Sequence, residues 1–192
     1  MRRAYLSVVC LLLLPMAALA QPEFPRAEVF AGYSYFRANP DGLNLNGWNG
    51  SVTGNINHWL GVEGDFSGHY GSPRVFGFSV PFVDINSHTI MVGPRVAYRS
   101  GSITPFAHFL VGAARAGTSG FGASISDSAF AAAMGGGIDF HLSRSVAVRA
   151  IQADYLVTRF KTTSTQIFFS GFDDRQNNFR VSAGIVFKLG NK

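Results

Sequence analysis

The chain has 192 residues, enough for one domain, with 22 glycines, 18 phenylalanines and only 14% charged residues. This number of charged residues is too small to cover the surface of an ordinary water-soluble domain. The net charge of +5 comes without a cluster of basic residues, which excludes a nucleic-acid-binding surface.

The N-terminus is typical of a secretory signal peptide. Arg2 and Arg3 follow the first methionine, and an apolar run over 4–14 and the small-residue site Ala18-Leu19-Ala20 come after them. We therefore expect a signal peptide at 1–20 and a single mature domain at 21–192. Cleavage would remove Cys10, the only cysteine, so the mature protein would have no disulfide and no thiol nucleophile.

Eight segments of the mature chain alternate apolar and polar residues with a period of two, which is typical of half-buried β-strands. We expect strands at 27–37, 45–57, 59–70, 88–99, 105–116, 129–141, 145–159 and 178–187. No long window favours a helical period. The alternation predicts an all-β domain.

The seventh segment breaks strict alternation. Arg149 falls on one face, whereas Gln152 and Asp154 fall on the other. If all three polar side chains face the same way, a β-bulge must shift the phase near Ala150 or Ile151.

The connectors between these segments alternate between short and long. The short ones lie around 57–58, 100–102 and 142–143, and the long ones span 38–44, 71–87, 117–128 and 161–177. An up-and-down sheet places every second connector at the same end. Short turns at one end and long loops at the other are typical of outer-membrane barrels, with the short turns in the periplasm.

The two faces of the strands differ in size as well as polarity. One face carries mostly glycine, serine, threonine and asparagine, and the other carries valine, isoleucine and aromatic residues. The apolar side chains are too bulky to share the lumen of an eight-stranded barrel. We therefore expect an eight-stranded antiparallel up-and-down transmembrane β-barrel, monomeric, with the apolar face toward lipid and small polar residues inside. A lipocalin-like periplasmic carrier is the non-membrane alternative.

Ten aromatic residues lie mostly near the ends of the expected strands. They are Tyr33, Tyr35, Trp48, Trp59, Phe66, Tyr70, Tyr98, Phe106, Tyr155 and Phe187. This placement predicts aromatic girdles at the two membrane interfaces. The general preference of β-strands for aromatic residues is the alternative explanation.

Charged residues of both signs fall on the presumed lumen face. They are Glu63, Asp65, Arg95, Asp139, Arg149, Asp154 and Arg180. Because an unpaired charge in a narrow lumen is costly, we expect these side chains to interlock as salt bridges that close the barrel. The alternative is a narrow, porin-like channel for small solutes whose charges rearrange.

Several stretches together resemble a known group, the small bacterial outer-membrane β-barrel proteins with OmpA-like or porin-family eight-stranded barrels. They are VFAGYSYFR (29–37), NHWLGVEGDFSG (57–68), GPRVAYRS (93–100), TPFAHFLVGAAR (104–115), GGGIDFHLSRSVAVRAIQADYLVTRF (135–160) and NNFRVSAGIVFKLG (177–190). The resemblance implies an outer-membrane location in a Gram-negative-type envelope, contact with outer-membrane lipid and insertion by the barrel-assembly machinery. That machinery reads a terminal aromatic residue, but here Phe187 is followed by five further residues, so we expect an internal signal.

The same resemblance offers catalysis as a further alternative, because some barrels of this size modify lipid A. Ser67, His69, Ser87, His88 and Asp84 lie near the presumed external end, but no fixed spacing marks a triad. We expect no enzymatic activity.

No cofactor or metal site is expected. Asp139 and His141 share a face, but two ligands are too few for a metal site. The glycines at 135–137 precede no helix, so we expect tight curvature or close packing there rather than a phosphate site.

Two of the long loops, 71–87 and 161–177, are unusually apolar. Exposed apolar residues suggest an extracellular partner or the membrane surface; alternatively, the strands extend into tall hairpins. The sequence thus predicts a structural, envelope-integrity or surface-interaction role.

Overall fold

A computed structural model describes residues 24–39, 43–71, 74–75, 78–79, 83–120, 123–160 and 175–191. The expected signal peptide at 1–20 lies outside the described residues, as do most of 161–177 and parts of 71–87.

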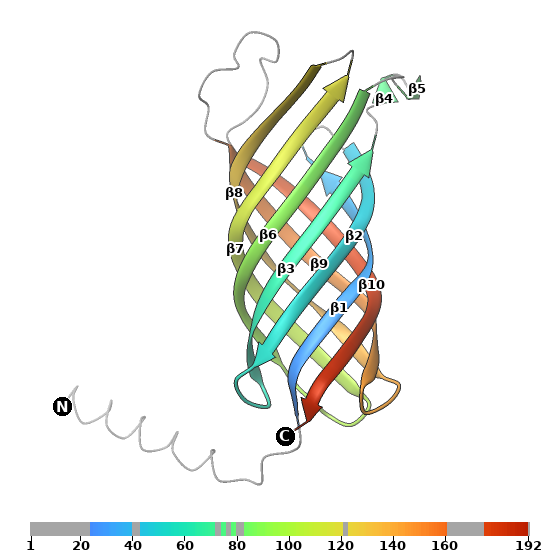
Figure 1. Cartoon of the computed structure of the whole chain (residues 1–192), viewed down its shortest axis with the longest axis vertical. Coiled ribbons are helices and arrows are strands. Elements are labelled where there is room, and N and C mark those ends of the chain that lie inside the picture. The colour runs from blue at the N-terminus through green and yellow to red at the C-terminus, as the bar shows by residue number, and fades with distance from the viewer. Residues whose placement is uncertain are drawn as a thin grey trace, which may run out of the picture.

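Eight antiparallel strands close into a barrel, which confirms the expected fold class (Figure 1). They are β1 (Pro25–Ala38), β2 (Leu43–Asn55), β3 (Leu60–Gly71), β6 (Val83–Ala97), β7 (Ile103–Gly120), β8 (Ala123–His141), β9 (Val146–Phe160) and β10 (Arg175–Asn191). Each barrel strand pairs with its neighbours along the chain, and β1 pairs with β10 to close the sheet. A small separate hairpin of β4 (Arg74–Val75) and β5 (Phe78–Ser79) lies between β3 and β6.

No helix in the described part of the chain is long and apolar enough to span a membrane.

The expected short turns are confirmed and share one end of the barrel with the start of β1 and the end of β10. They span 56–59, 98–102 and 142–145. The first turn is fixed by the Asn57 side chain, whose Oδ1 accepts hydrogen bonds from the backbone N–H groups of Trp59 (2.9 Å) and Leu60 (2.7 Å). Such side-chain capping makes a tight turn from few residues.

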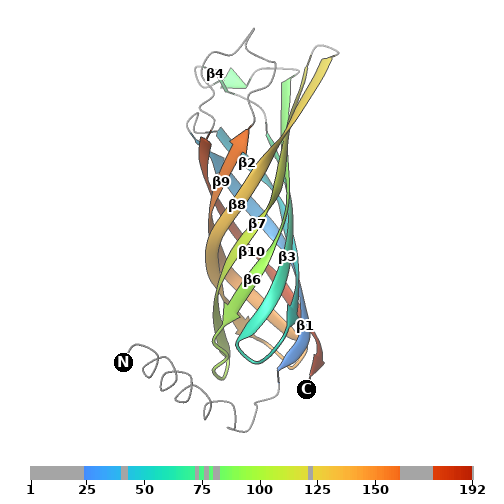
Figure 2. The same cartoon turned by 90° about the vertical axis from the view of Figure 1, so that its left-hand side faces the viewer.

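The expected long loop at 117–128 is wrong. β7 and β8 stay paired as far as Gly120 and Ala123, which leaves only 121–122 between them. Figure 2 shows this hairpin rising past the end of β9 at Phe160. A hairpin that rises beyond the lipid-facing part of the barrel needs no apolar face, so the alternation that marks the other strands is not required there.

The bulge expected in β9 is confirmed at Ala150. Across β8, Asp139 pairs with Arg149 and Ile138 with Ile151, which leaves Ala150 as the extra residue. The register against β10 shifts at the same place. The shift turns Arg149 and the polar residues that follow it toward the lumen.

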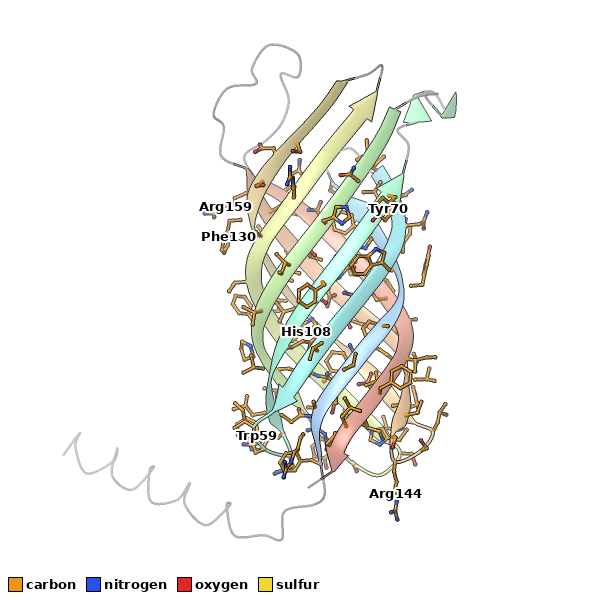
Figure 3. All side chains as sticks on the ribbon, in the orientation of Figure 1. Trp59, Tyr70, His108, Phe130, Arg144 and Arg159 are labelled. Carbon is orange, nitrogen blue, oxygen red and sulfur yellow. The ribbon has the colours of Figure 1, made fainter. Side chains whose placement is uncertain are left out.

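The apolar face points outward, as expected. Exposed side chains on the outer wall include Trp48, Val62, Phe66, Ile90, Val92, Val96, Phe109, Phe130, Met134, Ile151, Tyr155 and Ile185. Trp59 and Tyr70 mark opposite ends of this band in Figure 3. The prediction that Phe106 belongs to an aromatic girdle is wrong, because its side chain is 6% exposed and lies inside the barrel.

The expectation that small polar residues fill the interior is also wrong in part. Apolar side chains are buried inside as well, among them Phe30, Phe36, Leu45, Met91, Phe106, Leu110, Ala131, Ala133, Leu156 and Val186. A narrow barrel has to be filled to the packing density of a protein interior, and small polar residues alone do not fill it.

Candidate functional site

The seven charged residues predicted for the lumen all lie inside the barrel, on β3, β6, β8, β9 and β10. Their exposed fractions are 0% for Glu63, Asp65, Arg149, Asp154 and Arg180, 2% for Arg95 and 3% for Asp139. The structure brings all seven into one connected layer of ion pairs and hydrogen bonds, which we call the charged layer.

Arg180 connects the acidic residues in one half of this layer. Its Nη1 and Nη2 donate to Oδ1 (2.8 Å) and Oδ2 (3.1 Å) of Asp65, and its Nε donates to Oδ2 of Asp154 (2.9 Å). The guanidinium thereby joins β10 to β3, with which it shares no ladder, and to the neighbouring β9. Bidentate pairs of this kind fix geometry as well as charge.

Asp139 is the centre of the other half. It accepts hydrogen bonds from Nε (2.8 Å) and Nη2 (3.1 Å) of Arg149 and from Nη2 of Arg95 (3.0 Å). Gln152 links the two halves, because its Oε1 accepts from Arg149 Nη1 (2.7 Å) and its Nε2 donates to Asp154 Oδ2 (2.9 Å).

His108 forms a second link between the halves. Its Nε2 lies 2.8 Å from Asp154 Oδ1 and its Nδ1 lies 3.4 Å from Glu63 Oε2. Glu63 Oε2 in turn lies 3.7 Å from Arg95 Nε. His108 was not among the residues predicted for the lumen network. Its position on the polar face of its segment could have identified it.

Glu28 and Arg99 extend the layer toward the short-turn end. Glu28 Oε2 lies 3.1 Å from Arg95 Nη1, and Glu28 Oε1 accepts from Arg99 Nη2 (2.7 Å). Among the described residues the layer then holds five carboxylates and four guanidiniums, with His108 between two of the carboxylates. A protonated His108 would make it neutral overall.

Two buried phenylalanines cover the flat faces of the guanidiniums. The Arg149 carbon Cζ lies 4.2 Å from the centre of the Phe106 ring and 4.3 Å from that of Phe30, and Arg95 Cζ lies 4.0 Å from Phe106. A guanidinium keeps its N–H groups in its own plane, so its faces are free to stack on aromatic rings. The rings cover the faces of the two guanidiniums, while the edges of the guanidiniums make the ion pairs.

Residues 6–187 match the family described as Outer membrane protein beta-barrel domain. The chain belongs to this family. It is an outer-membrane β-barrel protein.

Solved structures share the fold of this outer-membrane barrel. Ail, the attachment invasion locus protein of Yersinia pestis, is 22% identical with a TM-score of 0.53, over 85% of this chain and 99% of that one. Neisserial surface protein A is 15% identical with a TM-score of 0.61 (85% and 97% covered). OprG from Pseudomonas aeruginosa is 9% identical with a TM-score of 0.54 (88% and 98% covered). No curated protein matches the chain by sequence.

In the lumen of this outer-membrane barrel, buried charges are costly unless every one is paired. Removing two charges from water costs several kcal/mol per ion, and good geometry is needed to offset it. Arg180 and Asp154 meet that condition, since each makes hydrogen bonds to more than one partner. Glu63 is the exception, because neither of its oxygens makes a hydrogen bond within the described structure.

The residues considered for lipid A chemistry are not gathered in this outer-membrane barrel. Ser67 and His69 face the lumen and are buried, whereas His88 is exposed on the outer wall. Ser87 is half-buried on β6, and the side chain of Asp84 lies outside the described residues.

The side chains of Asp139 and His141, which share a face, both contact other protein residues. Asp139 is engaged by two arginines, and His141 Nε2 lies 2.9 Å from Thr104 Oγ1. Within the described ranges, no three or more His, Cys, Asp or Glu side chains lie together in a way that would hold a metal ion.

The close packing expected at 135–137 is confirmed. A Cβ atom at Gly135 would collide with the Asp154 side chain, and one at Gly136 with the backbone of Phe106. These glycines let the strand wall approach the charged layer closely.

Proposed function

We propose that this outer-membrane barrel has a surface-interaction or structural role and that its lumen does not conduct. The observation that carries the proposal is the bridge from Asp65 through Arg180 to Asp154, which crosses the lumen with all three side chains fully buried. A solute passing this point would have to break these charge-assisted hydrogen bonds, and such bonds are about twice as strong as neutral ones.

The external end supports the surface-interaction part of the proposal. β7 and β8 form a hairpin that projects beyond β9, and Ser126, Asp127 and Ser128 are exposed on it. A barrel closed by an internal ion-pair layer is a rigid base for such a projection. Two of the similar structures carry the names attachment invasion locus protein and surface protein.

Planar-bilayer recording tests the closed lumen. We expect purified protein to give no stepwise conductance, and the double variant Asp65→Ala with Arg180→Ala to give small steps, because it shortens two side chains that cross the lumen. The matched control is Arg159→Ala, which removes an arginine from the exposed outer wall and should stay silent (Figure 3). Regular conductance steps from the unaltered protein would overturn the proposal.

An adhesion assay tests the surface role. Cells displaying the barrel with 117–128 replaced by a short turn, and with loops 71–87 and 161–177 shortened, should lose binding to host-cell or matrix surfaces. Heat-modifiable migration on a gel would show that each shortened barrel still folds. Unchanged adhesion by a folded barrel lacking all three segments would contradict the surface role.

A narrow channel for small solutes is the second candidate, and the environment of Glu63 favours it. This carboxylate lies 3.4 Å from His108 and 3.7 Å from Arg95, the longest pairs of the charged layer. If the lumen does conduct, Glu63→Gln should change the cation selectivity of the steps, and Arg159→Gln should not.

A further inference from the structure

We propose that the external half of the lumen is a binding site for one small, uncharged apolar molecule, the size of a benzene ring or a short alkyl group. The structure contains a cavity of about 120 Å³ at this place. An engineered apolar cavity of roughly 150 Å³ stays dry and binds benzene. The volume therefore suits one ring or a chain of a few carbons.

The walls of the cavity select for apolar ligands. The apolar part is formed by Phe36, Leu43, Leu45, Ile85, Ala114 and Leu156. None of the 14 lining residues carries a charge, so a charged molecule would find no partner for its charge there. One polar pair of the wall is already satisfied, because Asn178 Nδ2 donates to Thr158 Oγ1 (3.3 Å).

The apolar lining departs from the polar interior that outer-membrane barrels usually have. It belongs to a continuous cluster of buried residues that also includes Met91 and Leu110. Apolar side chains that line an unfilled space lack packing partners on one side, which lowers stability. A molecule that fills the space supplies those partners.

The charged layer closes the cavity on its inner side. On β9, Leu156 lines the cavity and Asp154, two residues toward the short-turn end, belongs to the charged layer. On β10, Asn178 and Arg180 have the same relationship. The charged layer therefore lies between the cavity and the short-turn end, and the proposed site stands whether or not the barrel has a surface-interaction role.

Methyl NMR with benzene as the probe tests the proposal in lipid nanodiscs. We expect the methyl signals of Leu45, Ile85 and Leu156 to shift with benzene and to saturate. Benzene also dissolves in lipid, so the outward methyl groups of Ile90 and Val92 serve as the internal reference and should shift without saturation.

A matched pair of variants locates the site. Ala114→Leu adds three carbons inside the cavity and should abolish the saturable shifts, whereas Ala113→Leu adds the same volume on the outer wall and should leave them intact. Ala116→Leu is the second filling variant if Ala114→Leu does not fold.

Three results would overturn the proposal. They are shifts that never saturate in the unaltered protein, saturable shifts that persist in a folded cavity-filling variant, and saturable shifts of equal size with charged benzoate. The benzoate comparison uses the unaltered protein, so it does not depend on any variant folding. Bilayer conductance has no bearing on these outcomes, so failure of the closed-lumen proposal would be seen separately.

Discussion

Arg180 and Asp65 are 115 positions apart and lie on strands that do not pair, yet two hydrogen bonds of 2.8 and 3.1 Å join their side chains across the lumen. In the barrel, β1 and β2 separate their strands on one side. The pair therefore exists only when the sheet has closed, and it reports on closure rather than on any single hairpin.

Replacing Arg180 with methionine should destabilise the barrel by about 3–5 kcal/mol, because two buried carboxylates lose their cation. Unfolding in urea, followed by tryptophan fluorescence and by heat-modifiable migration in lipid vesicles, would measure the change. Arg159→Met on the exposed outer wall is the control, and its effect should be small.

A variant that also lacks the carboxylates separates the effect of the unpaired charges from the effect of lost packing. Arg180→Met combined with Asp65→Asn and Asp154→Asn leaves no unpaired charge and should recover much of the lost stability. If Arg180→Met and Arg159→Met have the same free energy of unfolding, the ion pairs of Arg180 contribute nothing to stability.

The outer wall was predictable because lipid imposes a simple pattern on it. Outward residues in the middle of the barrel meet the same apolar solvent, so alternation in the sequence indicates which face a residue lies on, as Phe179 and Ile185 show. The bulge at Ala150 was predictable for the same reason, since polar residues of opposite parity can all face the lumen, away from lipid, only if a bulge shifts the phase.

The interior was less predictable because its neighbours are distant in sequence. Phe30 and Phe106 look like further apolar residues, and only the closed barrel shows that they stack on Arg149. The apolar cavity likewise depends on side chains from several strands, and no local period reveals it. The projecting part of the β7–β8 hairpin was missed because strands beyond the lipid-facing part of the barrel need no apolar face and therefore no alternation.

A charge in the middle of the outer band should be costly. Val92 is 53% exposed there, and Val92→Arg should lower the free energy of unfolding by about 2–4 kcal/mol because lipid does not solvate the guanidinium. Tyr98→Arg at the short-turn end, where the side chain is 73% exposed, should cost about 0–1 kcal/mol by the same depth dependence. Equal costs in a urea titration would place Val92 outside the bilayer.

Deleting Ala150 should prevent assembly. Without the extra residue, either Arg149 or the pair Gln152 and Asp154 must turn toward lipid, and the charged layer loses its link between β8 and β10. Loss of the heat-modifiable folded band would show the failure. Ala150→Val keeps the residue count and should fold, because this side chain is exposed on the outer wall. A folded deletion variant with intact lumen contacts would contradict the role assigned to the bulge.

Two glycines of neighbouring strands should respond to alanine with opposite signs. A Cβ atom at Gly32 would collide with the backbone of Ala183 on β10, whereas one at Gly54 would meet nothing within 4 Å. Neither residue has a positive φ, so the backbone conformation admits alanine at both positions. Gly54→Ala should stabilise the barrel by about 0.4–1 kcal/mol, because it restricts the unfolded chain. Gly32→Ala should destabilise it by about 1–3 kcal/mol, because β1 and β10 must move apart at the closing seam. Urea unfolding of both variants measures the difference, and a stabilised Gly32→Ala would show that the seam has room to spare.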